Sequence, residues 1–119
     1  FIDPDLAQVD ASQRIGADSV EFNTGKYTEL ETPEEIEAEL ERLKIAAKRA
    51  AEKGLRVFAG HGLNYDNVKP IAAIPEIEEL NIGHFIVGQA IYIGMENAVI
   101  EMIRTIKMGR AQKSWPGVL

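Results

Sequence analysis

Short strand patterns alternate with helix patterns along this chain, and the alternation limits the folds that it can adopt. The first clear strand is residues 18–23, where Val20 and Phe22 point to one side and Glu21 to the other. Strands that are separated by helices run parallel to one another, with right-handed crossovers between them. The chain is therefore predicted to be an α/β protein with a parallel sheet.

Further strand patterns stand before and after this segment. Phe1-Ile2 resemble the end of a strand, and Asp3 is the expected cap of the helix that follows. Two later strands are expected at residues 55–60, "LRVFAG", and 79–83, "ELNIG". The helices between and after these four strand positions are expected at residues 4–15, 33–53, 68–74, 84–94 and 95–107.

Loops and chain ends complete the pattern. Residues 24–27, "TGKY", are expected to form a loop, and residues 84–94 to form a short helix or turn that packs closely against the sheet. Residues 110–119 show no periodicity and are expected to lie on the surface or to dock through Trp115. The expected division is a domain at 1–109 and a tail at 110–119. In the last helix, the residues expected to be buried are Ala98, Val99, Met102, Ile103 and Ile106.

Four strand–helix units make either a small open sheet or half of a (β/α)8 barrel, and the strand ends favour the barrel. In such barrels, functional residues gather at the carboxyl ends of the strands. Here polar residues follow the strands, among them Glu21, His61 and His84. Because Val20 and Phe22 suit the helix side, Glu21 is expected to point into the barrel, where a lone carboxylate is costly unless it is paired or used. The alternative is an exposed edge residue of an open sheet.

Charge and composition exclude several partners. The net charge is −6 and no stripe of lysine and arginine appears, which argues against nucleic acid. No apolar run reaches the length of a membrane span, so no membrane partner is expected. The chain has no cysteine, which suits a cytoplasmic protein. Its two histidines are not spaced as a helical ligand pair, so no metal site is expected.

Both histidines follow a strand pattern and a glycine. His61 lies between Gly60 and Gly62, which leave its ring accessible, and an imidazole in water titrates near neutrality, as proton transfer requires. The alternative for His61 is a structural role, with the ring satisfied by a backbone carbonyl. Gly83-His84 stand where a strand leads into a helix, and the free N–H groups of a helix N-terminus favour phosphate. His61 is thus a candidate for catalysis and Gly83-His84 for phosphate binding.

Residues 59–94 carry a resemblance to a known enzyme family. Their sequence, "AGHGLNYDNVKPIAAIPEIEELNIGHFIVGQAIYIG", is similar to the C-terminal part of the pyridoxine 5′-phosphate synthases, the ring-closing enzymes of the deoxyxylulose-phosphate route to vitamin B6. The resemblance continues upstream through "FIDPDLAQVDASQRIGADSVEFNTGKY" and downstream through "GMENAVIEMIRTI". It covers nearly the whole chain apart from the C-terminal tail.

This resemblance implies a fold and a reaction. The family fold is a (β/α)8 TIM barrel that assembles into an octamer, and the chain matches its second half, strands five to eight with their helices. Family members condense 3-amino-2-oxopropyl phosphate with 1-deoxy-D-xylulose 5-phosphate, which gives pyridoxine 5′-phosphate, inorganic phosphate and water. No metal or organic cofactor is expected. The implied partners are phosphorylated small molecules, inorganic phosphate and further copies of the chain in a homo-oligomer.

The resemblance also implies roles for single residues. His61 matches the family's proton donor, and Glu21 matches an acidic residue that stabilises the transition state. Gly62 matches a contact to the amino-ketone phosphate, and Gly83-His84 match the pair that binds the phosphate group of this substrate. Asn23 departs from the family, which usually has histidine at this place, so no proton transfer is expected at Asn23.

Motifs of the family's first half have no counterpart in the chain. They include an early Asp-His segment, arginines that grip the phosphates and a second catalytic glutamate. A chain that opens in mid-strand suggests a fragment, and half a barrel leaves sheet edges and inner strand faces open. Two functions therefore stay open. The chain is a synthase that is active once the other half is supplied, or it is a non-catalytic half-barrel that binds phosphate and serves as an assembly unit.

Overall fold

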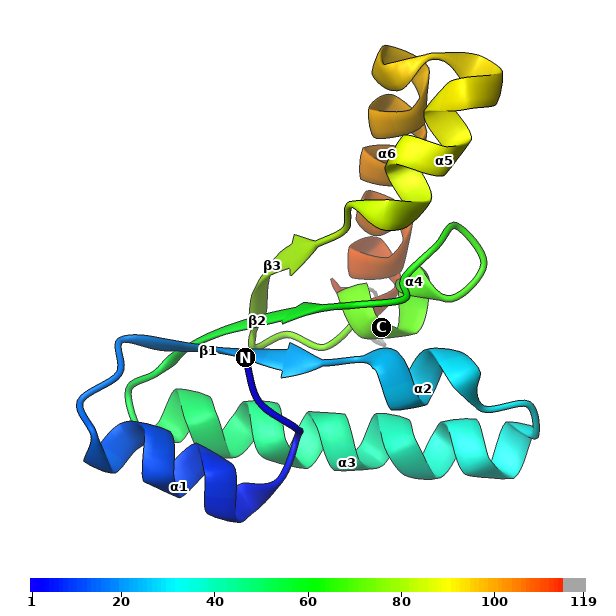
Figure 1. Cartoon of the computed structure of the whole chain (residues 1–119). Coiled ribbons are helices and arrows are strands. Elements are labelled where there is room, and N and C mark those ends of the chain that lie inside the picture. Colours follow the sequence, from blue (N-terminus) through cyan, green and yellow to red (C-terminus); the bar gives the residue numbers. More distant parts are fainter. Residues whose placement is uncertain (115–119) are drawn as a thin grey trace.

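The computed structural model describes residues 1–114, in which a parallel sheet packs against helices (Figure 1). Strands and helices alternate along the chain as the sequence predicts. Trp115, the expected docking residue of the tail, lies outside the described residues. In chain order the elements are α1 (Leu6–Arg14), β1 (Ser19–Asn23), α2 (Gly25–Glu29), α3 (Pro33–Glu52), β2 (Arg56–Gly60), α4 (Val68–Ala72), β3 (Ile77–Asn81), α5 (His84–Ile93) and α6 (Met95–Ser114).

The sheet has the strand order β1-β2-β3, and its pairs are parallel, which confirms the α/β prediction. In this register Phe22 lies beside Ala59. Ile2 adds a single parallel bridge to Phe22, so the first of the four predicted strand positions is present as one bridged residue. β3 begins and ends two residues earlier than predicted, and it ends before Gly83 because that residue already caps the following helix. The arrangement is consistent with half of a TIM barrel.

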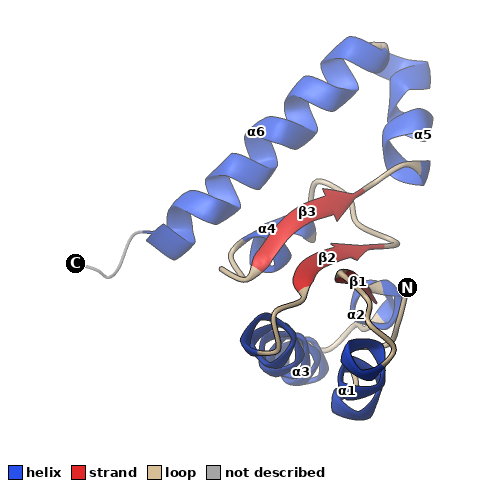
Figure 2. Ribbon diagram, turned by 90° about the vertical axis from the view of Figure 1, so that its left-hand side faces the viewer, coloured by secondary structure: helices blue, strands red, loops and turns tan. Residues whose placement is uncertain are grey.

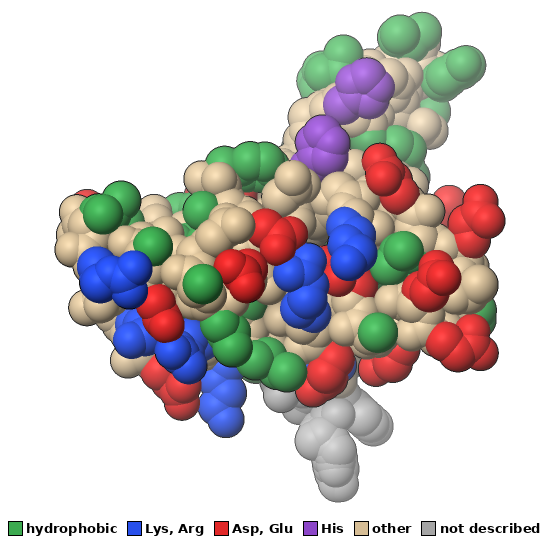
Figure 3. All heavy atoms as spheres, turned by 60° about the horizontal axis from the view of Figure 1, so that its bottom comes forward, with side chains coloured by type: hydrophobic (Ala, Val, Ile, Leu, Met, Phe, Trp, Pro, Cys, Tyr) green, Lys and Arg blue, Asp and Glu red, His purple; other side chains and the backbone are tan. Residues whose placement is uncertain are grey.

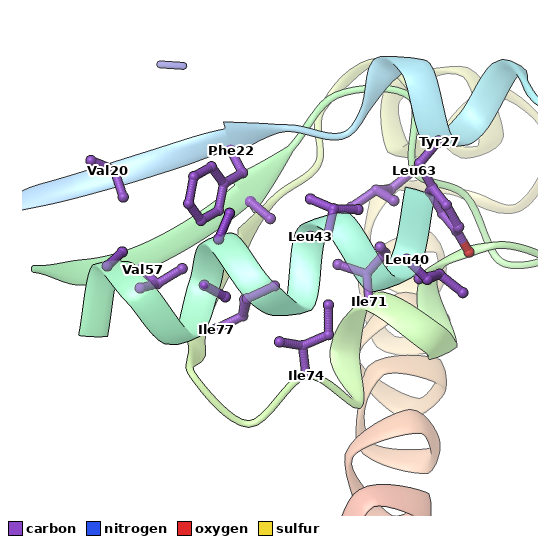
Figure 4. Packing of buried hydrophobic residues seen from close by; sticks show 14 of the residues in the cluster. Val20, Phe22, Tyr27, Leu40, Leu43, Val57, Leu63, Ile71, Ile74 and Ile77 are labelled. Atoms are coloured by element: carbon purple, nitrogen blue, oxygen red, sulfur yellow. The ribbon is translucent and has the colours of Figure 1, made fainter. Parts of the chain in front are cut away.

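One face of the sheet forms the hydrophobic core with α3. Val20 and Phe22 are buried, as the alternation of β1 predicts, and Val57 of β2 is buried beside Val20. Figure 4 shows these side chains on the side of Leu43, which α3 contributes. Figure 2 shows α1 and α3 together below the sheet. Glu21 alternates with the two buried residues of β1, so its side chain points away from this core.

Helix α3 begins after a threonine cap, Thr32, and its first residue is a proline. The hydroxyl oxygen of Thr32 accepts a hydrogen bond from the N–H of Glu35 at 3.3 Å. From Glu39 onwards, buried residues recur every three to four positions, so one side of the helix faces the core. The buried residues of α3 are Glu39, Leu40, Leu43, Ala46, Ala47 and Ala50.

Arg42 joins α3 to the N-terminal segment. Its guanidinium donates to the carboxylate of Asp3 at 2.8 and 3.0 Å, and to the carboxylate of the buried Glu39 at 2.9 and 3.0 Å. The hydrogen bonds from Arg42 lower the pKa of Asp3 below its ordinary value. Because Asp3 is engaged in this pair, the prediction that it caps α1 is wrong. The carboxylate of Asp5 caps the helix instead and accepts from the N–H of Gln8 at 3.3 Å.

A short helix, α2, stands in place of the loop expected at residues 24–27. Local hydrogen bonds explain it. Asn23 Oδ1 accepts from the N–H of Gly25 at 2.8 Å, and the Thr28 hydroxyl donates to the Gly25 carbonyl at 2.9 Å. The segment after β1 is therefore an ordered turn of helix.

Helices α5 and α6 form a hairpin that projects away from the sheet (Figure 1). The prediction that residues 84–94 pack closely against the sheet is wrong, because no residue of α5 is buried and the helix mainly contacts α6. Val99 and Ile103 of α6, expected in the core, are 37% and 47% exposed. Apolar side chains gather at the far end of this hairpin (Figure 3). No helix in residues 1–114 combines the length and the apolar character that a membrane crossing requires.

The C-terminal part of α6 is fixed to α4 and to the segment that leads into β3. A Cβ atom added at Gly109 would lie 2.6 Å from a carbonyl oxygen of α4, so glycine permits this close approach. Arg110 donates to the carbonyl oxygens of Ile74 and Ile77. Residues 110–114 therefore continue α6 as helix, where an aperiodic tail was expected to start.

Candidate active site

A cleft opens at the carboxyl ends of β1, β2 and β3. Its volume is about 600 Å³. All five residues that the sequence singles out for function lie in its wall. The two imidazoles lie near the base of the projecting hairpin (Figure 3). The residues that line the cleft are Phe1, Glu21, His61, Gly62, Leu63, Asn64, Asn81, Ile82, Gly83, His84 and Phe85.

Glu21 reaches across the open face of the sheet. Its Oε1 accepts a hydrogen bond from Asn81 Nδ2 at 2.9 Å, so the carboxylate has a polar partner on β3. Gly60 of β2 stands beside Asn81, and a Cβ atom added at Gly60 would lie 2.7 Å from Glu21 Oε2. The absence of a side chain at Gly60 thus leaves room for the carboxylate. From the sequence, Asn81 is one of the polar residues at the strand ends but has no predicted role, and its contact with Glu21 now places it in the site.

His61 leaves β2 with its side chain exposed in the cleft wall. Its φ is +96°, and no other residue except glycine has a positive φ in the described part of the chain. Gly62 follows with φ +77°, and a Cβ atom added there would lie 2.2 Å from Thr28 Oγ1, so glycine is required. The carbonyl oxygen of His61 accepts a hydrogen bond from the Thr24 hydroxyl at 2.6 Å.

The loop after Gly62 is held by its own side chains and by α2. Asn64 Oδ1 accepts from the N–H groups of Asp66 and Asn67 at 2.8 and 3.0 Å. The Tyr27 hydroxyl donates to the carbonyl oxygen of Asn67 at 2.7 Å, and burial raises the pKa of Tyr27. The loop that begins at His61 is therefore held by hydrogen bonds of its own residues and by one from α2.

Tyr65 links this loop to the helical hairpin. Its hydroxyl donates to the carbonyl oxygen of Ala98 on α6 at 3.1 Å. Its ring meets Phe85 edge-on, with the ring centroids 4.7 Å apart and the planes at 87°. Phe85 directly follows His84, so Tyr65 connects two walls of the cleft.

Gly83-His84 join β3 to α5. Gly83 is the N-cap of this helix of 10 residues, and no side chain caps it. The first N–H groups of a helix have no acceptor within it, and the helix dipole favours negative charge at this end. Both residues line the cleft. The arrangement can therefore receive an anion through backbone donors.

Other candidate groups have no place in the cleft wall. Asn23 is absent from the lining, and its amide oxygen accepts a hydrogen bond from the N–H of Gly25 at the start of α2. Within residues 1–114, no three histidine, cysteine, aspartate or glutamate side chains gather as a metal ion would require. No lysine or arginine among the described residues lines the cleft. Its polar groups are one carboxylate, two imidazoles, the amides of Asn64 and Asn81, and backbone donors.

Comparison with known proteins decides the family. Residues 1–108 match the family described as pyridoxal phosphate biosynthesis protein PdxJ. The chain belongs to the PdxJ family. Its PdxJ relatives include the pyridoxine 5′-phosphate synthase of a Sulfurihydrogenibium species, which is 53% identical over 112 residues. That match covers 94% of this chain and 46% of the relative.

Two further PdxJ relatives agree with this match. The pyridoxine 5′-phosphate synthase of a Synechocystis species is 54% identical over 102 residues, which are 86% of this chain and 42% of the relative. That of Blochmanniella floridana is 49% identical over 107 residues, 90% of this chain and 43% of the relative. The PdxJ chain thus spans about half the length of the curated relatives that it matches, and it corresponds to their C-terminal part. The resemblance drawn from the sequence is confirmed.

Proposed function

We propose that this chain supplies part of the active site of a pyridoxine 5′-phosphate synthase. The proposed reaction condenses 3-amino-2-oxopropyl phosphate with 1-deoxy-D-xylulose 5-phosphate and releases pyridoxine 5′-phosphate, phosphate and water. One observation carries the proposal. Glu21, His61 with Gly62, and Gly83-His84 follow or belong to three different strands, yet they line one cleft. In this proposal, Ile2 and the three strands are strands five to eight of a TIM barrel.

His61 and Glu21 are the proposed catalytic residues. The exposed imidazole of His61 is accessible to a substrate in the cleft, as a proton donor must be. The Glu21 carboxylate, held by Asn81, supplies a fixed negative charge. Such a charge stabilises positive charge that develops when the amine of one substrate attacks the carbonyl of the other.

Gly83-His84 are the proposed phosphate site for the amino-ketone substrate. The uncapped start of α5 offers backbone N–H groups to the anion. Gly62 contacts the same substrate from the opposite loop, where the lack of a side chain lets the backbone approach closely. The substrate would thereby lie between the His61 loop and the start of α5.

The lining of the cleft favours a shared active site. Two phosphorylated substrates bring several negative charges, but no lysine or arginine in residues 1–114 lines the cleft. We therefore propose that the other half of the barrel supplies the cationic contacts, and that copies of the complete protein form a homo-oligomer in the cytoplasm. The same observation favours a second function, in which the chain alone is a non-catalytic, phosphate-binding assembly unit.

A product assay tests the synthase proposal. In the complemented protein, the part of the Sulfurihydrogenibium synthase that precedes the matched region is joined to this chain. We expect the complemented protein to form pyridoxine 5′-phosphate from the two substrates, detected by mass spectrometry, and the chain alone to form none. A folded complemented protein that forms no product would contradict the proposal, and product from a dilute monomer of the chain alone would contradict the shared site.

A phosphate titration tests the binding site separately. Inorganic phosphate should shift the amide signals of Gly83, His84 and Phe85 in the NMR spectrum of the chain. The start of α3 is the internal control, because Thr32 caps it and acidic residues follow in its first turn. Shifts confined to α3 or to other segments would contradict the site. Phosphate binding by the chain without product from the complemented protein would favour the second function.

A further inference from the structure

Thr24 is a fully buried polar residue at the end of β1. Its N–H donates to the carbonyl oxygen of Gly60 at 2.9 Å, and its hydroxyl donates to the carbonyl oxygen of His61 at 2.6 Å. The two acceptors are consecutive and lie where β2 turns out of the sheet. Thr24 therefore fixes the backbone at the root of the His61 loop.

The hydroxyl of Thr24 makes this contact in preference to a local one. Thr24 stands at the N-cap of α2, where a threonine side chain commonly accepts from an N–H of its own helix. No such bond is present, and the hydroxyl proton is donated outward, to a residue 37 positions along the chain. The cap of α2 is left to Asn23, whose amide oxygen accepts from Gly25 N–H.

His61 requires this support because its backbone is strained. An L-residue rarely adopts a φ of +96°, and such conformations persist when the surroundings hold them. Gly62 continues with a positive φ, so two consecutive residues depart from the strand conformation. The bond from Thr24 reaches the carbonyl of the peptide between these two residues and sets the direction in which the His61 side chain leaves the backbone.

The imidazole of His61 packs against the start of α2. A Cβ atom added at Gly25 would lie 2.9 Å from His61 Cδ2 and 3.7 Å from His61 Nε2. Thr28, one helical turn later, packs against Gly62, where an added Cβ atom would lie 2.2 Å from Thr28 Oγ1. Thr24 holds the backbone of the loop, while Gly25 gives the ring the space that it occupies.

We propose that Thr24 is a positioning residue that sets the orientation of the His61 imidazole in the cleft. It acts through His61, because Thr24 is buried and does not line the cleft. The effect on ring orientation stands on the geometry alone, whereas the effect on catalysis rests on the proposed function.

The first test is made on the chain as it stands, by NMR of its two imidazole rings. Thr24→Val keeps the shape of the side chain and removes the hydroxyl, and Thr24→Ser keeps the hydroxyl. We expect Thr24→Val to shift the ring signals of His61 more than those of His84, and Thr24→Ser to restore the wild-type positions. His84→Gln assigns the two sets of signals. Unchanged His61 signals in folded Thr24→Val, or equal shifts at both rings, would overturn the proposal.

Thr105→Val is the matched control. The Thr105 hydroxyl is also buried and donates to a backbone carbonyl, that of Glu101 at 2.8 Å, but on α6 outside the cleft. This variant should leave the His61 signals unchanged, and a shift as large as that of Thr24→Val would mark a general effect of losing a buried hydroxyl. If Thr24→Val does not fold, Thr24→Ala leaves room for a water molecule at the carbonyl and decides by the same signals.

The second test uses turnover of the complemented protein. Thr24→Val should lower kcat by about 10- to 100-fold, the usual result of a misplaced catalytic group, with little change in KM, and Thr24→Ser should recover most of the activity. A change in KM alone, or full activity in Thr24→Val, would overturn the catalytic part. If the complemented protein with Thr24 forms no product, the proposed function fails, and the imidazole signals still decide the positioning.

Discussion

Asn81 Nδ2 and Glu21 Oε1 are 2.9 Å apart and join the two outer strands of the sheet across the intervening β2. The contact is possible because β2 has Gly60 at this point, where a Cβ atom would lie 2.6 Å from the Asn81 carbonyl oxygen and 2.7 Å from Glu21 Oε2. A site carboxylate is thus placed by the absence of a side chain on the neighbouring strand.

Gly60→Ala should therefore destabilise the chain. The added methyl group meets backbone on one side, which cannot move as a side chain end does, so we expect a loss of about 1–3 kcal/mol in the free energy of unfolding, as for other overpacked sites. Gly88→Ala is the control, because a Cβ atom there has open space inside α5, and it should stabilise by about 0.5–1 kcal/mol. Urea unfolding of both variants checks this. Equal stability of the two variants would contradict the close approach at Gly60.

His61→Asn should lower turnover of the complemented protein by about 10²–10⁴-fold, the usual effect of removing a general acid. The fold should be retained, because the His61 side chain is exposed. His84→Asn is the comparison, and it should mainly raise KM for the amino-ketone phosphate. Steady-state kinetics separate the two results, and wild-type turnover in His61→Asn would show that the imidazole has a structural role only.

Arg42→Met should destabilise the chain, because it leaves the buried carboxylate of Glu39 with only Lys26, at 3.8 Å. Breaking a fully buried pair costs about 3–5 kcal/mol, and the exposure of Arg42, 34%, reduces the expected loss to about 2 kcal/mol. Arg104→Met breaks a similarly spaced pair with Glu101 on the surface of α6 and should cost less than about 0.5 kcal/mol. Thermal unfolding measures both, and similar losses would contradict the role of burial.

The pH dependence of stability should reflect the same pair. Hydrogen bonds from Arg42 lower the pKa of Asp3 in the folded chain below the ordinary 3.8. A carboxyl group with a lowered folded pKa contributes stability above its unfolded pKa and loses it as the pH falls through the folded value. Arg42→Met should therefore show a shallower loss of stability than the wild type below about pH 4. Urea unfolding across this range checks the slope, and parallel curves would contradict the expectation.

The exposed tip of the hairpin should promote association of the chain. Ile91 and Tyr92 are 81% and 84% exposed, and apolar surface of this kind drives binding to another surface. Ile91→Lys should shift sedimentation towards the monomer without loss of helix content. Ile15→Lys is the control, because Ile15 is equally exposed, at 84%, but follows α1 on another part of the molecule. If both variants or neither changed the sedimentation, the hairpin would not be the associating surface.

The parts of the fold that depend on local periodicity are predictable from the sequence. Val20 and Phe22 are buried and Glu21 faces the other way, because side chains in a strand alternate. Thr32 caps α3 because its hydroxyl can reach a nearby N–H. The site follows from the same logic, since parallel strands bring His61 and His84 to one edge of the sheet.

The parts that the sequence does not give depend on distant partners. Asp3 and Asp5 are equally good helix caps, and Arg42, far along the chain, decides between them. The apolar composition of α5 indicates that the helix must pack against another surface. It does not indicate that the sheet leaves the helix unburied. The hydrogen-bond partner of the Thr24 hydroxyl is also remote in the sequence. The sequence does not predict it, because a threonine at this position could equally have capped the start of α2.

Tyr65 connects the helical hairpin to the cleft by direct contacts. One end of its side chain is bonded to α6, its ring rests against the residue after His84, and its backbone belongs to the loop that begins at His61. A displacement of the hairpin would therefore be transmitted through Tyr65 to the residue that follows His84 and to the loop that begins at His61. The position of the hairpin and the shape of the cleft are in this way coupled through one aromatic side chain.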